Sequence, residues 1–210
     1  INDNGDTSLT RAIEENDSDT AERLINNCAD VNKTKDGNNA LILACEKGNA
    51  RIVDLLIEKG AYLNERGTSG WTALMIACKN GSFDIAEKLL DKRVLIDIQN
   101  DACETALMIA CRNGYNDIVE KLLENGASID KQNGLGETAL MIACQNEFII
   151  VVEKLLNRGV SIDKQKNSGD TALMIACARG NGKLIEILLL KGAAVNMTNA
   201  LGSTPLFIAC

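Results

Sequence analysis

The stretch Thr72–Cys78, which reads Thr-Ala-Leu-Met-Ile-Ala-Cys, decides the interpretation because it returns unchanged three times along the chain. Its copies stand at 105–111, 138–144 and 171–177, each 33 positions after the one before. A fixed period of this length is typical of a stacked repeat array, in which each unit buries its apolar face against its neighbours. The sequence therefore predicts an array whose function lies on its surface.

This period divides the chain into repeats within a single domain, 1–210. In the first repeat the polar residues Thr10 and Arg11 interrupt the core stretch, and we expect them to face water as part of a terminal cap. The expected units are a capping repeat at 5–35, internal repeats at 36–66, 67–99, 100–132, 133–165 and 166–198, and the start of a truncated repeat at 199–210.

Each repeat predicts two short helices and a return loop. A Thr or Asn before the first helix can accept the unpaired amides of its first turn. A glycine about two turns later ends that helix, and paired apolar residues such as Leu89 and Leu90 give the second helix one buried face. A glycine-containing extended return then predicts a hairpin loop. The expected caps are Asn39, Thr72, Thr105, Thr138, Thr171 and Thr204.

Charge and hydropathy restrict the class of partner. The net charge is -7, with acidic and basic residues interspersed through every repeat, which disfavours a surface for nucleic acid or anionic membranes. No apolar run approaches the roughly 18 to 20 residues of a membrane-spanning helix. We therefore expect a monomer that binds a protein partner and neither nucleic acid nor membrane.

Cysteine recurs at the same position of successive repeats. Neighbouring helices in a stack lie about 8 to 10 Å apart, whereas a disulfide needs Cα atoms within about 7 Å. We therefore expect free, buried thiols that serve packing, and an intracellular, cytoplasmic location that keeps them reduced. The chain has no histidine and no close Cys-x-x-Cys pair, so the sequence predicts no metal site. It also has no phosphate-cradling glycine loop, and it predicts no cofactor. The recurring residues are Cys45, Cys78, Cys111, Cys144, Cys177 and Cys210.

Helix, turn, helix and hairpin in 33 residues, with Thr-Ala-Leu, Gly, Leu-Leu and Gly-Ala at fixed places, resemble the ankyrin repeat over the whole chain. The resemblance implies an all-α fold, an ankyrin-type α-solenoid of helix-turn-helix units joined by β-hairpin loops. Two features of this sequence depart from the residue pattern of the family. Its usual Pro after the Thr occurs only as Pro205. Its usual His is replaced by Met, Ile or Phe, which we expect to pack in the core rather than line a binding groove.

The resemblance also implies that a partner binds at the hairpin tips and the exposed side of the first helices, a concave face. Residues vary between repeats along this strip. Trp71 has only polar equivalents in the other repeats, and exposed Trp and Arg are typical anchors of interfaces. The alternative is that Trp71 folds over its own hairpin. The predicted protein-binding residues are Arg66, Trp71, Lys79, Glu104, Arg112 and Leu135.

A second, weaker candidate is Phe148–Ile150, where apolar residues interrupt the local pattern. An interaction patch and a locally repacked turn are both open interpretations. Nearby, Glu147 stands where other repeats have glycine. Arg93, Cys28 and Cys103 do the same, and we expect a local adjustment of the turn at each.

The leading functional hypothesis is a non-enzymatic protein-protein interaction scaffold. Without histidine, catalysis would have to rely on carboxylates, Lys or Cys, and no carboxylate pair stands out from the solvated charges. The alternative is a substrate-recruiting region of a larger enzyme, since the chain starts without Met and stops part-way through a repeat. Irregularities such as Arg93 favour a natural, duplicated array over an engineered consensus.

Overall fold

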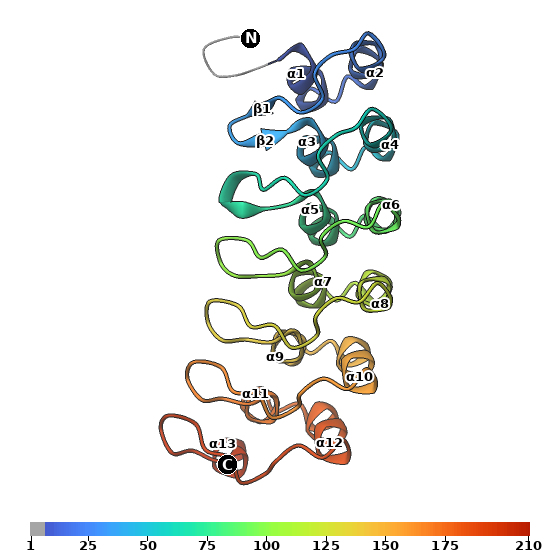
Figure 1. The fold of residues 1–210 in the computed structure, drawn as a ribbon. Helices are drawn as coiled ribbons and strands as arrows, with labels where there is room; N and C mark the ends of the chain where they lie inside the picture. Colours follow the sequence, from blue (N-terminus) through green and yellow to red (C-terminus); the bar gives the residue numbers. More distant parts are fainter. Residues whose placement is uncertain (1–6) are drawn as a thin grey trace. The chain divides into compact units, whose positions relative to one another are not determined.

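The computed structural model describes residues 7–210, which fall into two compact units, 7–101 and 102–210. Residues 5 and 6 of the expected capping repeat lie outside the described residues. Within each unit, Figure 1 shows the first helices of the repeats stacked in one column, the second helices in another, and the loops projecting beyond the first.

The first unit holds three complete helix pairs and the loops between them. In the stack α3 contacts both α1 and α5, while α4 contacts α2 and α6. The elements are α1 (Ser8–Glu14), α2 (Ser18–Asn26), β1 (Thr34–Lys35), β2 (Asn38–Asn39), α3 (Ala40–Glu46), α4 (Ala50–Glu58), the 3-10 turn η1 (Thr68–Gly70), α5 (Ala73–Asn80) and α6 (Phe83–Asp91).

The second unit repeats this arrangement and ends on a single short helix. There α9 lies between α7 and α11, α11 also contacts α13, and α10 lies between α8 and α12. The elements are α7 (Ala106–Asn113), α8 (Asn116–Glu124), α9 (Ala139–Gln145), α10 (Ile149–Asn157), α11 (Ala172–Arg179), α12 (Gly182–Leu190) and α13 (Pro205–Ala209).

Every predicted cap is confirmed. The side chain of each accepts a hydrogen bond from the backbone amide three residues on, as Thr105 does from Met108 at 3.3 Å. The same bond forms at Asn39, where the acceptor is the amide oxygen, 2.9 Å from the nitrogen of Ile42. At the last cap, Thr204, the following Pro205 takes the first helical position, where no N–H is needed. Local side-chain chemistry thus fixes where each first helix begins.

The core of both units consists of the repeated stretch itself. Leu107, Ile109 and Ala110 of α7 are at most 2% exposed, and their counterparts in the other internal repeats are at most 8% exposed. The four Met residues at the usual His position, Met75, Met108, Met141 and Met174, are each 1% exposed. They pack in the core, as expected, and expose too little surface to form a Met-lined binding groove. Phe207, at the same position of the last repeat, is 72% exposed, against the expectation.

Two expectations at the termini are wrong. Thr10 is only 1% exposed, because its hydroxyl exchanges hydrogen bonds with Thr7 in a capping box at the start of α1. Arg11 does face water, beside Glu15. At the other end Cys210 is exposed, as are Cys28 and Cys103, whereas the other five cysteines are buried, and all eight are free.

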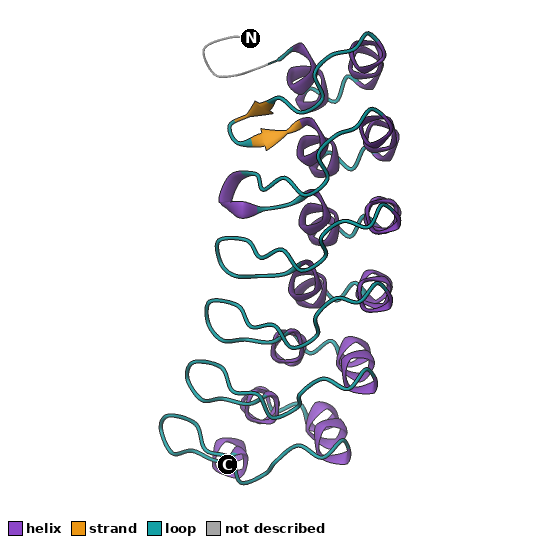
Figure 2. Ribbon diagram, viewed as in Figure 1, coloured by secondary structure: helices purple, strands orange, loops and turns teal. Residues whose placement is uncertain are grey.

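The return loops are joined to one another by backbone hydrogen bonds. In the described residues only the loop between Thr34 and Asn39 forms paired strands, drawn in orange in Figure 2. In the second unit each loop donates to the loop before it: Gly134 to Ala102 at 2.9 Å, Asn167 to Leu135 at 3.0 Å and Ala200 to Ser168 at 2.9 Å. This ladder holds successive loop tips in register.

The residues that replace glycine keep the glycine conformation. Arg93 has φ +55°, Cys28 +62°, Cys103 +59° and Glu147 +59°, all in the left-handed region. The expected local adjustment of the turn does not occur. Arg93, Cys28 and Glu147 follow helix ends and Cys103 lies in a return loop, and each keeps the positive φ of the glycines at the same position. These side chains therefore occupy a conformation that costs non-glycine residues free energy.

Candidate functional site

The predicted protein-binding residues divide equally between the two compact units. Arg66, Trp71 and Lys79 belong to the first unit, and Glu104, Arg112 and Leu135 to the second. We call these two sets the first-unit patch and the second-unit patch.

In the first-unit patch Trp71 lies against the end of its own helix. Its backbone is extended, and its carbonyl accepts the amide of Gly67 at 2.8 Å, which closes the loop just before the cap Thr72. The ammonium of Lys79, in the last turn of α5, lies 5.3 Å from the centre of the indole ring. The half-exposed indole thus makes a cation–π contact with a side chain of α5.

Arg66 links two neighbouring loops of the same unit. Its guanidinium lies 2.9 Å from the carboxylate of Asp101, and both side chains are more than half exposed. A Cβ placed on Gly70 would approach Arg66 to 2.5 Å and Asp101 to 2.6 Å, so glycine leaves the room that this ion pair occupies. An exposed pair of this kind contributes about 0.2 to 1 kcal/mol. Arg66 is therefore partly engaged in holding the loops together.

The second-unit patch repeats the Trp71–Lys79 arrangement with different chemistry. Glu104 occupies the position of Trp71, one residue before the cap, and Arg112 occupies the position of Lys79 in the last turn of α7. The two form an ion pair, with the Glu104 side chain only 11% and that of Arg112 40% exposed. In both repeats, the residue before the cap thus contacts the residue at the end of the first helix.

Leu135 presents an apolar side chain at a loop tip. It is 64% exposed, although its amide is held by Asn133 at 3.0 Å. Leu201 occupies the same loop position two repeats later and is 89% exposed. Leu201 was not among the residues predicted from the sequence. It could have been found there, because it lies 66 residues, or two full periods, after Leu135.

The Phe148–Ile150 candidate resolves into two different environments. Phe148 is half-buried, and its ring lies so close to Gly114 that a Cβ there would meet it at 2.7 Å. Glu147 accepts a hydrogen bond from Asn181 at 2.7 Å. Ile150 is 55% exposed. The turn is therefore packed against the neighbouring repeat, and only Ile150 offers substantial apolar surface.

The described residues show few features that support chemistry. Among residues 7–210 no group of three or more His, Cys, Asp or Glu is placed to hold a metal ion. Burial raises the pKa of the Cys144 thiol to about 12 and raises those of Cys45, Cys78 and Cys177 as well, which keeps these thiols protonated and unreactive near neutral pH. No helix in this part of the chain has the length and apolar character to cross a membrane.

Comparison with known proteins establishes the family. A family model described as ankyrin repeats in three copies matches residues 1–67, 62–133, 86–166 and 140–210. The chain belongs to the ankyrin repeat family. Ankyrin repeats are protein-protein interaction modules, and the fold is the expected all-α solenoid of helix pairs and hairpin loops.

Solved structures and curated proteins similar to the chain include ankyrin repeat domains of different origin. The ankyrin repeat domain of Bcl-3, described as a unique member of the IkappaB protein family, is 29% identical with a TM-score of 0.88, covering 99% of this chain and 96% of that one. The human ASB11 ankyrin repeat domain is 28% identical with a TM-score of 0.86, covering 98% and 92%.

Among curated proteins, the potassium channels AKT1 of Oryza sativa subsp. indica and subsp. japonica are each 38% identical over 71 residues. This match covers 32% of the chain and 8% of either channel. The chain therefore spans only a small part of the length of these relatives.

Proposed function

We propose that the chain is a non-enzymatic scaffold that binds a protein partner through its loop tips and the exposed ends of its first helices. The observation that carries this proposal is the contrast within each repeat. The residues of the first helix that repeat are buried, whereas the residues that differ, such as Trp71 and Leu135, reach the surface on the loops. Differences between repeats at exposed positions are what recognition of an irregular partner requires.

The two patches supply different anchors. Trp71 is pre-oriented by Lys79, so it loses little side-chain freedom when a partner covers it. Leu135 offers an apolar tip on a loop fixed by backbone hydrogen bonds. Rigid aromatic and apolar anchors surrounded by charged groups are typical of the centre of a protein-protein interface.

The first experiment is affinity capture from the native lysate with the wild-type chain and the Trp71→Ala variant. Removal of a buried interface Trp costs about 2 kcal/mol or more, or about thirtyfold in affinity, so the partner recovered by wild type should be lost. Tyr62→Ala is the matched control, because Tyr62 is an exposed aromatic residue of the same unit that lies after the second helix of its repeat. Equal recovery by wild type and Trp71→Ala would remove the first-unit patch from the site.

The second patch is tested in the same way with Leu135→Ala against Leu95→Ala. Both leucines are 64% exposed, but Leu95 follows the second helix α6, away from the loop tips. We expect Leu135→Ala alone to weaken capture. If both variants capture as wild type does, the second-unit patch is not part of the interface.

The alternative is that the repeats recruit a substrate for a larger protein of which they are a segment. The observation that favours it is that the similar AKT1 channels are many times longer than the match. Reading the complete gene around this segment tests it, and a gene without any catalytic domain would exclude this alternative.

A further inference from the structure

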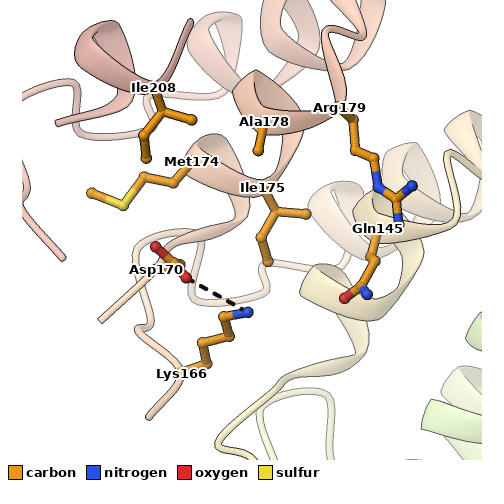
Figure 3. A pocket seen from close by; sticks show the side chains of 8 residues that line it. All are labelled: Gln145, Lys166, Asp170, Met174, Ile175, Ala178, Arg179 and Ile208. Carbon is orange, nitrogen blue, oxygen red and sulfur yellow. Dashed lines mark ion pairs between the residues drawn. The ribbon is translucent and has the colours of Figure 1, made fainter. Parts of the chain in front are cut away.

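A hollow of about 330 Å³ lies on the second unit, between the end of α9, the loop 166–170, α11 and α13. Figure 3 shows Lys166 and Asp170 on its loop side, Arg179 and Gln145 near the end of α11, and Met174, Ile175 and Ile208 along its wall. This volume is at the lower end of the range for ligand sites, which suits one side chain of a bound protein better than a cofactor.

Three residues that line the hollow differ in chemistry from their counterparts in most other repeats. Lys166 stands where Asn100, Asn133 and Asn199 stand in their loops, and it brings a positive charge in place of an amide. Arg179 likewise stands where Asn80, Asn113 and Asn146 stand, and it adds a positive charge that Lys47 shares at the same position of an earlier repeat.

The third departure opens the space itself. Ala178 takes the position at which Lys79, Arg112 and Gln145 have long side chains. Lys79 and Arg112 reach back to the residue before the cap. A methyl group cannot reach Asp170, so the volume that those side chains fill in the earlier repeats is left open here. Departures at three positions of an otherwise regular array converge on one hollow.

The charges in the hollow are not balanced internally. Burial alone would raise the pKa of Asp170, but hydrogen bonds from Ser168 and Asn199 and the charge of Lys166 outweigh it, so the pKa lies below its usual range and the group is ionised. The Lys166 ammonium lies 3.6 Å from that carboxylate. The Arg179 side chain makes no ion pair or hydrogen bond within residues 7–210. One uncompensated guanidinium therefore borders the hollow in a chain whose net charge is -7.

We propose that this hollow receives the carboxylate of a Glu or Asp side chain of a bound protein, with Arg179 as its ionic partner. The planar guanidinium matches a carboxylate with two parallel hydrogen bonds, and the amide of Gln145 can donate another. The aliphatic part of the incoming side chain lies against Ile175 and Ile208. This inference rests on the proposed protein-binding function and names one chemical group that the partner presents.

The test selects random linear peptides on the whole 210-residue chain, and measures affinities of the best peptide and its Glu→Gln or Asp→Asn analogue by fluorescence anisotropy. We expect one acidic residue whose neutralisation weakens binding about tenfold, the size of a charge-assisted hydrogen bond. Arg179→Asn, which restores the residue of three other repeats, and Ala178→Gln, which fills the hollow, should abolish that difference. Circular dichroism confirms that both variants fold.

Lys183→Asn is the matched control, since Lys183 is an exposed cation of the neighbouring α12, and it should keep the tenfold difference. The proposal is overturned if the acidic residue matters equally in wild type and Arg179→Asn, or if no peptide is selected. Displacement of neutral and acidic peptides alike by millimolar inorganic phosphate would show a general anion site and also overturn it. If Trp71→Ala abolishes binding while Arg179→Asn has no effect, the hollow is not part of the site, but the proposed protein-binding function still holds.

Discussion

Arg93 illustrates how the repeat imposes its backbone on a residue that does not favour it. Its φ of +55° is matched by +83° at the equivalent Gly60 and Gly126, and its side chain is exposed. A left-handed conformation costs a non-glycine residue about 1 to 2 kcal/mol, because Cβ crowds the following carbonyl. The strain here is therefore local and removable.

Arg93→Gly should stabilise the chain by about 1 kcal/mol, after allowance for the greater freedom of glycine in the unfolded state. Urea unfolding followed by circular dichroism measures the change. Lys92→Gly is the matched control: Lys92 has φ -87°, so the same replacement brings no relief there and should destabilise. An Arg93→Gly variant no more stable than wild type would show that the turn tolerates the side chain without strain.

At the level of the helix, each first helix depends on one capping side chain. The first helices of the repeats are only five to eight residues long, too short to persist without packing and capping. The cap Thr105 is 1% exposed, and its hydroxyl accepts the amide of Met108. Removal of this hydroxyl leaves the buried amide of Met108 without an acceptor, and water cannot reach the amide to take its place.

Thr105→Ala should therefore lower the free energy of unfolding by about 1 to 2 kcal/mol. Thr105→Ser keeps the oxygen and should recover most of this loss, so the pair separates the hydrogen bond from the packing of the methyl group. Thermal unfolding of the three proteins gives the comparison. If the Ala and Ser variants melt together, the cap is not what stabilises α7.

The same scale shows what the sequence can and cannot predict. The caps, the glycine stops and the buried Met residues followed from the sequence because each depends on neighbours a few residues away or on the repeat itself. The contacts of Trp71 with Lys79 and of Glu104 with Arg112 did not, since they join a loop to a helix end through side-chain geometry. The hollow beside Arg179 was not predicted, because the prediction of structure relied on residues that recur in every repeat. The hollow arises where residues differ between repeats.

For the whole chain, the buried thiols couple stability to pH. The pKa of Cys144 is raised to about 12, and Cys45 and Cys78 are raised by the same cause, burial. In the unfolded chain a thiol ionises near pH 8.5, so above this pH the unfolded state loses protons that the folded state keeps. The free energy of unfolding is therefore highest below the pKa of the thiols in the unfolded chain. It falls as the pH rises toward their pKa in the folded protein.

Each such thiol should lower the free energy of unfolding by about 1.4 kcal/mol per pH unit above about pH 8.5. Trp71, the only tryptophan, lies in the same unit as Cys45 and Cys78 and reports urea unfolding by fluorescence under reducing conditions. Cys78→Ala should reduce the slope by one thiol's share, even though it lowers stability at neutral pH. An unchanged slope would contradict the assignment of this pH dependence to buried thiols.

The backbone ladder between neighbouring loops has an evolutionary consequence. In the second unit the tips are tied by main-chain atoms of Ala102, Leu135 and Ser168, and these side chains differ without any change in the bonds. A point mutation at a tip therefore changes the exposed surface while the backbone bonds persist. Under the proposed function, descendants of such an array would change their partner one tip at a time, so new specificities would accumulate by single steps without an unfolded intermediate.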